Sequence, residues 1–95
     1  MKILITGATS GIGAATAKRF AQDYHDLWLI GRREERLENI KTQLQQEFGI
    51  DVEITPMDVR NFSDFEKLAI QLKRKWKAPD ILVNNAGLAL GLGTI

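Results

Sequence analysis

The sequence predicts an α/β fold with four strands in a parallel sheet and three helices. Two patterns predict it. Four short apolar runs alternate along the chain with three longer segments whose apolar residues recur at helical spacing. Three of the four runs are continuous, which is typical of strands covered on both faces of a parallel sheet. Strand–helix–strand units of this length need right-handed crossovers and parallel strands.

The first strand is expected at residues 3–5 and the second at residues 27–30, with a helix over residues 12–24 between them. Both strand segments consist of aliphatic and aromatic residues without a break. The helix carries small and aromatic residues on the face expected to pack on the sheet, namely Ala15, Ala17, Phe20 and Ala21.

The second helix is expected over residues 34–48, followed by a third strand at residues 52–55. Gly49 is expected just beyond the helix end, because glycine adopts the left-handed conformation there without penalty. Because of Glu53 and Thr55, polar and apolar residues alternate in the third strand, which favours a position nearer the edge of the sheet. The apolar helix residues at helical spacing are Leu37, Ile40, Leu44 and Phe48.

The third helix is expected to begin near Ser63, because Ser63-Asp64-Phe65-Glu66 has the form of a capping box. Pro79 ends this helix, and the fourth strand follows at residues 81–83. The expected buried stripe of the helix is Phe65, Leu68, Ala69, Leu72 and Trp76.

Composition excludes several classes of protein. The 95 residues hold 13 basic and 12 acidic side chains, a net charge of +1 that gives no reason to expect nucleic acid or a membrane surface as partner. No apolar run approaches the roughly 18 residues of a membrane-spanning helix, and the N-terminus does not have the form of a signal peptide. The absence of cysteine excludes disulfides and zinc–thiolate sites and favours the cytoplasm; no metal site is expected.

A glycine-rich loop, Thr6-Gly7-Ala8-Thr9-Ser10-Gly11-Ile12-Gly13, connects the first strand to the first helix. Such a loop brings backbone amides and the positive end of the helix close to a phosphate. We expect Gly7 to allow a sharp turn, Gly11 to leave room for a pyrophosphate and Gly13 to let helix and strand pack closely. The spacing differs from the Gly-x-Gly-x-x-Gly fingerprint, and by itself the loop is equally consistent with an ordinary glycine turn.

The loop resembles the cofactor loop of the short-chain dehydrogenases/reductases, and Asn84-Asn85-Ala86-Gly87 is similar to the second motif of that family. The resemblance extends to about Gly91. It implies a partial Rossmann-type doubly wound sheet with strand order 3-2-1-4, and hydride transfer between a nicotinamide cofactor and a carbonyl or alcohol. The loop residues that it implies for cofactor binding are Gly7, Ala8, Thr9, Ser10, Gly11 and Ile12.

The tip of the second strand predicts which cofactor binds. Members that prefer NAD carry an acidic residue there for the ribose 2′-hydroxyl, whereas this chain has Gly31-Arg32-Arg33. Two guanidinium groups offer planar donors to a 2′-phosphate, so we predict NADP(H). The alternative is a solvated arginine pair that opens a helix.

Residues after the third and fourth strands complete the expected site. The resemblance implies that Asp58 and Val59 contact adenine, with the carboxylate accepting from the N6 amine; the alternative for Asp58 is a turn after a strand. Asn85 is expected to reach the cofactor ribose, while Asn84 can equally bond to neighbouring loops. The alternative for both is an asparagine-rich turn.

Three other features are not assigned to a site. His25 is expected on the surface, in the turn before the second strand. The basic run at residues 73–77 closes a helix, where cations interact favourably with the dipole, so we expect a solvated helix end. Trp28 and Trp76 are expected in the core.

The resemblance also implies a catalytic Tyr and a Lys four residues later, and the sequence does not contain them. The chain has one tyrosine, Tyr24, and Trp28 stands four residues after it. No catalytic residue is therefore assigned, and residues 1–95 are expected to be the N-terminal, cofactor-binding half of a longer protein, truncated before its catalytic part.

Two functions remain open at this stage. Residues 31–33 and 84–91 are similar to a subgroup of NADP-dependent 3-hydroxy acid dehydrogenases, including those that act on serine or allo-threonine; this implies that the complete protein oxidises a small hydroxy acid. The alternative is a non-enzymatic NADP(H)-binding or interaction module. The fourth strand is expected to be an unpaired apolar edge, which predicts a homo-oligomer.

Overall fold

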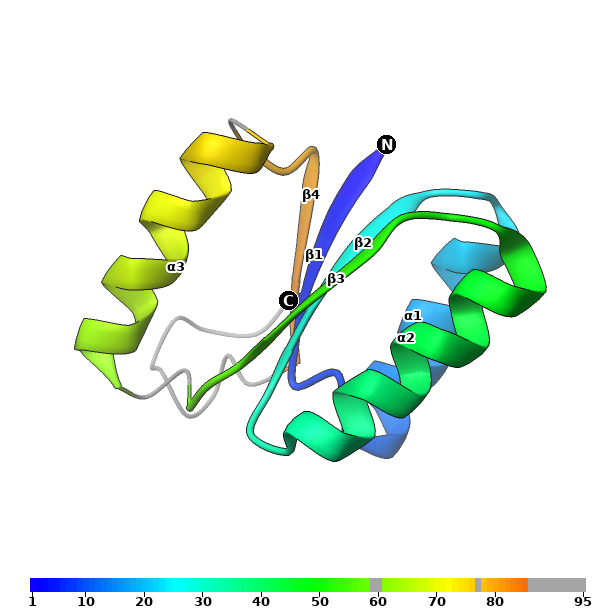
Figure 1. Cartoon of the computed structure of the whole chain (residues 1–95), viewed down its shortest axis with the longest axis horizontal. Helices are drawn as coiled ribbons and strands as arrows, with labels where there is room; N and C mark the ends of the chain where they lie inside the picture. The colour runs from blue at the N-terminus through cyan, green and yellow to red at the C-terminus, as the bar shows by residue number, and fades with distance from the viewer. Residues whose placement is uncertain (59–60, 77, 86–95) are drawn as a thin grey trace.

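The computed structural model describes residues 1–58, 61–76 and 78–85. Strands and helices alternate along the chain (Figure 1). They are β1 (Lys2–Thr6), α1 (Gly11–Gln22), β2 (Asp26–Gly31), α2 (Glu34–Phe48), β3 (Val52–Pro56), α3 (Phe62–Lys75) and β4 (Ile81–Asn84). The strands form one parallel sheet in the order β3-β2-β1-β4. The predicted fold class and strand order are confirmed.

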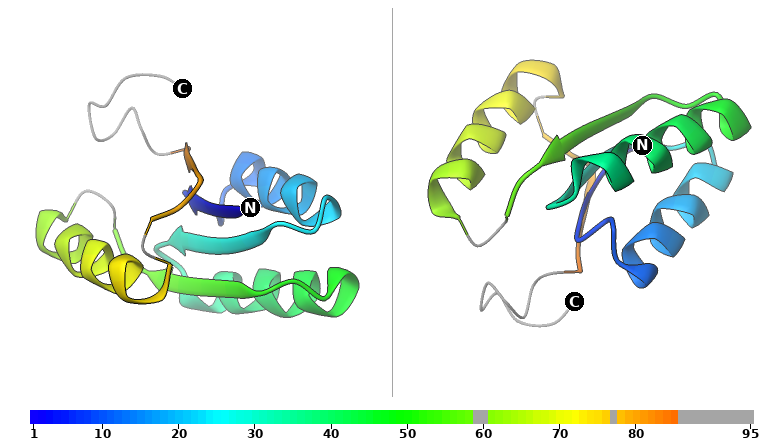
Figure 2. Two further views of the ribbon diagram at one scale, coloured as in Figure 1. Left: turned by 90° about the horizontal axis from the view of Figure 1, so that it is seen from above. Right: turned by 60° about the horizontal axis from the view of Figure 1, so that its bottom comes forward.

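The sheet separates two hydrophobic cores. Helices α1 and α2 cover one face and α3 covers the other, as Figure 1 and the right view of Figure 2 show. Alternate residues of the central strands enter opposite cores, because successive side chains of a strand point to opposite faces. The first core includes Ile3, Ile5, Ala17, Ala21, Leu27, Leu29, Leu37 and Leu44. The second contains Leu4, Trp28, Ile30, Met57 and Leu68, with Phe65, Leu72 and Trp76 packed against it.

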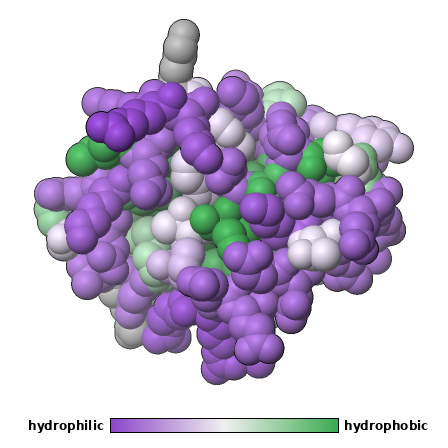
Figure 3. Space-filling view, viewed as in Figure 1, coloured by the Kyte–Doolittle hydropathy of each residue, from purple (hydrophilic) through white to green (hydrophobic). Residues whose placement is uncertain are grey.

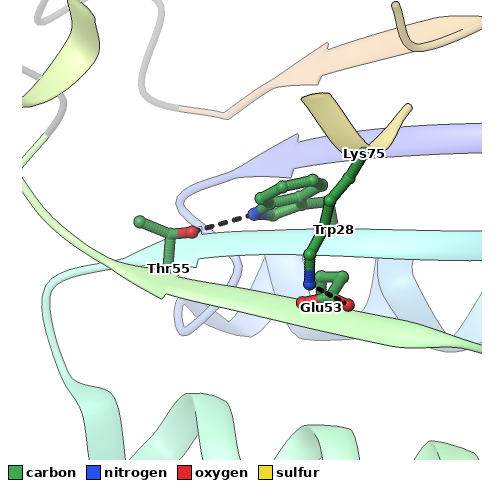
Figure 4. A network of polar contacts seen from close by, with 4 residues as sticks. All are labelled: Trp28, Glu53, Thr55 and Lys75. Atoms are coloured by element: carbon green, nitrogen blue, oxygen red, sulfur yellow. Dashed lines mark hydrogen bonds and ion pairs between the residues drawn. The ribbon is translucent and has the colours of Figure 1, made fainter. Parts of the chain in front are cut away.

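β3 lies at one edge of the sheet, as its alternating sequence predicted, and its polar side chains bond to β2 and α3. Trp28 Nε1 donates to Thr55 Oγ1 at 2.9 Å, and Lys75 Nζ lies 2.9 Å from Glu53 Oε1 (Figure 4). The ring of Trp28 meets Trp76 edge to face at a centroid distance of 5.3 Å. Both tryptophans therefore belong to the packing of α3 on the sheet, as predicted.

Three helix ends differ from the predictions: both ends of α1, which spans Gly11–Gln22 where residues 12–24 were expected, and the start of α3. Helix α3 begins at Phe62, one residue before the predicted cap Ser63, because the side chain of Asn61 accepts from the amide of Asp64 at 3.2 Å. Helix α1 ends at Gln22, and Tyr24 takes a φ of 62° in the turn that follows. Gly49 has a φ of 68° just after α2, as expected.

The predicted burial of two alanines is wrong, and several large apolar residues are exposed. Ala15 and Ala69 are exposed because each lies to one side of the packed face of its helix. The face of the molecule in Figure 3 is mostly hydrophilic, with hydrophobic residues in small groups. The exposed large apolar residues are Met1, Ile12, Tyr24, Phe62, Ile70 and Leu82. Across the described ranges, no helix combines the length and apolar character needed to cross a membrane.

Candidate functional site

The candidate site residues gather at the carboxyl ends of the four strands, at the lower end of the sheet in Figure 1. The glycine loop follows β1, Arg32 follows β2, Asp58 lies two residues beyond β3, and Asn85 follows β4. Parallel strands bring these ends to one rim. Ligands of open α/β sheets bind at this rim, where the strand order reverses, here between β1 and β4.

The glycine loop makes a sharp turn that caps α1. Gly7 has a φ of 63°, which confirms the predicted need for glycine there. Ser10 is the N-cap residue: its Oγ accepts from the Gly13 amide at 3.0 Å and donates to the Gly7 carbonyl at 2.8 Å. These bonds fix the direction of α1 relative to the loop.

Gly13 lies where the helix passes closest to the loop. A Cβ at this position would overlap the Gly7 carbonyl oxygen and lie 2.9 Å from the Ala8 Cα. The expected close packing is confirmed. At Gly11, by contrast, a Cβ would meet no atom within 4 Å, so the surface above this residue is open.

The first two amides of α1 are available to bind an anion. A helix begins with N–H groups that have no partner within the helix. Ser10 occupies the Gly13 amide, but among the described residues the amides of Gly11 and Ile12 have no hydrogen-bond acceptor. Ile12 is 75% exposed. Two exposed donors at the positive end of a helix are suited to a phosphate group.

The loop is tied to the tip of β2. The Ala8 amide donates to the Ile30 carbonyl at 3.0 Å, and Thr9 packs over Gly31. Arg32 and Arg33 follow and are exposed, and neither forms an ion pair with any residue that the structure describes. The two exposed arginines thus follow directly after Gly31, the residue on which Thr9 of the glycine loop packs.

A second set of bonds joins β1 to β4. The hydroxyl of Thr6, a residue only 2% exposed, donates to Asn84 Oδ1 at 2.8 Å. Asn85 Nδ2 donates to the Thr6 carbonyl at 3.1 Å. The two motifs that carry the family resemblance are therefore in direct contact. This use of Thr6 was not predicted.

Asp58 lies close to the end of β3. It is half-buried, and its carbonyl accepts from the Asn61 amide at 2.9 Å, so it also begins the turn that leads into α3. The adjacent Met57 is buried, and its amide donates to the Gly31 carbonyl at 2.8 Å. The predicted partner Val59 and the motif residues Ala86 and Gly87 lie outside the described residues.

The remaining polar groups lie away from this rim. His25 is half-buried at the amino end of β2, where its Nδ1 lies 3.1 Å from the N-terminal amine. Tyr24 is 71% exposed in the same turn. Over the parts of the chain that the structure describes, no group of three or more His, Cys, Asp or Glu residues is placed to hold a metal ion.

Sequence reasoning did not identify the contact between Thr9 and Gly31. The signal was present in the sequence, since a residue without a side chain directly precedes the two arginines. The role of Gly31 depends on which residue of the glycine loop packs on it, and the sequence does not show which residue that is.

The parallel sheet, the glycine loop capping α1 and the rim of polar residues define a nucleotide-binding α/β domain. The family model described as short chain dehydrogenase matches residues 1–94, and the chain belongs to that family.

Curated relatives agree with this assignment. The chain is 45% identical over 92 residues to the NADP-dependent 3-hydroxy acid dehydrogenase YdfG of Escherichia coli O6:H1, covering 97% of this chain and 36% of that protein. It is 50% identical over 90 residues to the serine 3-dehydrogenase of Agrobacterium fabrum, covering 94% and 34%. The chain thus spans about a third of the length of these relatives.

A solved structure shows the same architecture. The L-sorbose reductase of Gluconobacter frateurii, complexed with NADPH and L-sorbose, superposes with a TM-score of 0.84 at 34% identity. The match covers 90% of this chain and 33% of that one. The four strands and three helices described above therefore correspond to a part of a known oxidoreductase fold.

Proposed function

We propose that this chain binds NADP(H) and is the cofactor-binding portion of an oxidoreductase. In complete form, the enzyme would transfer hydride between NADP and a small hydroxy acid. Two features carry the proposal together: at the start of α1, two amides without an acceptor among the described residues, and at the tip of β2, two arginines without an ion pair among those residues. The similarity to NADP-dependent and NADPH-bound proteins supports it.

The glycine loop would hold the pyrophosphate. Its Gly11 and Ile12 amides donate to a phosphate oxygen, and the open surface at Gly11 admits the group without steric conflict. Thr9 and Ser10 would line the approach, whereas Ala8 is fully buried and its amide donates to the Ile30 carbonyl, so it shapes the loop from beneath. The cofactor, when bound, supplies or accepts the hydride.

Arg32 and Arg33 would select the 2′-phosphate. Each charge-assisted hydrogen bond is worth roughly 1.5–3 kcal/mol. Two such contacts favour NADP(H) over NAD(H) by about one to three orders of magnitude. Glu34 and Glu35 lie in the first turn of α2, where they interact favourably with the helix dipole.

Asp58, Val59 and Asn85 complete the proposed site. The Asp58 carboxylate would accept from the adenine amine and Val59 would cover the ring. Asn85 uses its Nδ2 to bond to Thr6, which leaves its carbonyl oxygen to accept from a ribose hydroxyl.

The substrate is proposed from the relatives alone. One is described as a 3-hydroxy acid dehydrogenase and another as a serine 3-dehydrogenase. Since the chain spans about a third of their length, we place the hydride-transfer residues outside residues 1–95. The competing function is a non-enzymatic NADP(H)-binding or interaction module on the same scaffold.

Titration of the purified chain with NADPH and NADH tests the cofactor assignment. The parent chain should bind NADPH at least tenfold more tightly, by the hydrogen-bond energies above. Arg32→Ala should remove most of this preference, whereas Arg74→Ala, at an exposed position on α3, should leave it unchanged. Equal affinity of the parent chain for both nucleotides would refute the proposal.

The function of a longer protein needs a separate test. Reduction of NADP⁺ with serine or a 3-hydroxy acid, measured on a protein that contains this chain and the region its relatives carry beyond it, supports the enzyme. Binding of NADPH without any turnover by that protein supports the module.

We also propose self-association through β4. Among the residues that the structure describes, this strand pairs only with β1; it carries no charge and exposes Leu82 to 49%. An uncharged apolar edge is a template for pairing with another chain, and a second copy meets no charge repulsion there. Sedimentation at increasing concentration should show dimers that Leu82→Lys removes; a monomer at all concentrations would contradict this.

The absence of cysteine supports a cytoplasmic location, which imaging of a tagged protein would check.

A further inference from the structure

A groove runs between the edge strand β3 and helix α3. Two adjoining cavities form it, of about 420 Å³ and about 170 Å³, and both are lined by Thr55 on the strand and Gln71 on the helix. The larger cavity extends to Glu53 and the smaller one to Met57, so the groove follows β3 along its length. The larger cavity falls within the roughly 300–1,000 Å³ typical of ligand sites. No residue of the glycine loop lines either cavity.

The strand side of this groove presents backbone groups that the sheet does not use. Among the residues that the structure describes, β3 pairs only with β2. The Met57 amide and the Asp51 carbonyl both bond to β2. Because the backbone groups of a strand alternate between its two sides, those of Val52 and Ile54 point away from the sheet. Pro56, the next residue of that set, has no N–H. The free edge therefore offers the amides of Val52 and Ile54 to an added strand.

Basic side chains line the helix side of the groove. Lys67 and Arg74 lie two turns apart on α3, and neither forms an ion pair with any residue that the structure describes. On the strand side, Lys75 pairs with Glu53 at 2.9 Å (Figure 4). The other acid at the groove, Asp64, lies in the first turn of α3, where the helix dipole compensates part of its charge. The groove therefore holds two cations that have no acidic partner among the described residues.

We propose that this groove binds an extended acidic segment of a partner protein, which adds to the sheet as a strand beside β3. The backbone of the segment bonds to the free groups of Val52 and Ile54. Its acidic side chains, at alternate positions, lie on the α3 face, where Lys67 and Arg74 stand about 10 Å apart along the helix. The residues between them lie on the opposite face beside Ile54, which is partly buried against the first core, so these residues are apolar. Addition of a strand to an exposed sheet edge is a common mode of peptide recognition.

The charge of the groove favours such a segment over a second copy of this chain. An antiparallel pair of β3 strands, related by a two-fold axis, would place both α3 helices on the same face of the joined sheet. Lys67 and Arg74 of one copy would then face the same residues of the other, and like charges repel. An acidic segment instead supplies the partners that these two side chains lack.

Binding of a designed peptide to the whole chain tests the proposal. The probe is a fluorescein-labelled peptide in which glutamate and valine alternate, and the control peptide has glutamine in place of each glutamate. By fluorescence anisotropy, the glutamate peptide should bind about tenfold more tightly than the control, and this difference should shrink at high salt. No binding of the glutamate peptide, or equal binding of both peptides, would overturn the inference.

Substitutions on α3 locate the charge contacts. Lys67→Ala and Arg74→Ala should each weaken binding of the glutamate peptide about threefold, and Lys67→Glu combined with Arg74→Glu at least tenfold. Lys73→Glu is the matched control, because Lys73 is exposed on the same helix but lines neither cavity, and it should change the affinity less than about twofold. An equal loss in Lys73→Glu would show that net charge, not this groove, attracts the peptide.

Amide hydrogen exchange tests whether the peptide adds as a strand. The amides of Val52 and Ile54 should exchange at least tenfold more slowly when the glutamate peptide is bound. Those of Glu53 and Thr55, which face β2, should change less. Unchanged exchange at both Val52 and Ile54 would show that the peptide does not pair with β3, and the inference would be wrong.

The remaining outcomes separate this inference from the other proposals. In Leu82→Lys, where β4 carries a charge, dimers that persist in sedimentation and exclude the peptide would show that a second copy occupies the groove, which would overturn the inference. Arg74→Ala should weaken peptide binding and leave the affinity for NADPH unchanged, so the cofactor assignment can fail while this inference stands, and the reverse.

Discussion

A single methyl group at Gly13 should disrupt the glycine loop. Gly13 is buried in the first turn of α1, directly beneath the turn at Gly7. In Gly13→Ala, the new Cβ overlaps the Gly7 carbonyl oxygen and lies 2.8 Å from the Gly7 carbonyl carbon and 2.9 Å from the Ala8 Cα. All three atoms belong to the backbone, so no side chain can rotate away to relieve the conflict.

The magnitude follows from two opposing effects. Overpacking a rigid site costs about 1–3 kcal/mol, and here the helix must also withdraw from the Ser10 cap, whose loss costs about 1 kcal/mol. Replacing glycine by alanine within a helix stabilises the helix by up to about 1 kcal/mol. The free energy of unfolding should therefore fall by about 1–3 kcal/mol, which lowers the unfolding temperature by about 4–24 °C for a domain of this size.

Urea and thermal unfolding monitored by circular dichroism measure this loss, with Gly11→Ala as the control. A Cβ at Gly11 meets no atom within 4 Å, so Gly11→Ala should leave the stability unchanged or raise it by up to about 1 kcal/mol. If Gly13→Ala is as stable as Gly11→Ala, the close approach between α1 and the loop does not limit the fold and the reasoning is refuted.

Three further substitutions probe the two cores and the edge of the sheet. Leu68→Ala should destabilise the chain by about 2–5 kcal/mol because Leu68 is 2% exposed, whereas Ile70→Ala, at 57% exposure on the same helix, should stay within about 0.5 kcal/mol in urea unfolding; similar losses would contradict the assigned core. Thr6→Val should cost about 1 kcal/mol by removing the hydroxyl that bridges β1 to β4, and an unchanged urea midpoint would count against that bond. Glu53→Gln should cost less than about 1 kcal/mol, and only at low salt, because its ion pair with α3 is partly exposed; a large loss at high salt would disagree.

Patterns within short stretches of sequence predicted most of the fold. The apolar runs and helical spacings placed all seven elements, and Glu53 and Thr55 predicted the edge position of β3. The prediction failed where two local signals competed. Asn61 and Ser63 are both good helix caps, and the sequence alone did not show that Asn61 is the one that accepts from the helix, from the Asp64 amide.

Local sequence patterns also predicted part of the site, in the glycine loop. The spacing of Gly7, Gly11 and Gly13 was enough to predict the sharp turn and the close packing, because both are local properties of a strand-to-helix connection. The resemblance predicted a nicotinamide cofactor, and the pair of arginines at the tip of β2, in the place of an acid, predicted NADP(H) rather than NAD(H) from charge.

Contacts between strand ends were decided only by the tertiary structure. Thr6 bonds to Asn84 and Asn85, which follow it by 78 and 79 residues, and Thr9 packs on Gly31. Such contacts depend on the register and twist of the sheet, which fix the positions of these residues relative to one another to within a few tenths of an ångström. The sequence by itself determined the order of the elements and the charge of the site, because hydrophobic periodicity and residue type act locally. The exact partners of Thr6 and Thr9 follow from the packing of the whole sheet, which no local pattern encodes.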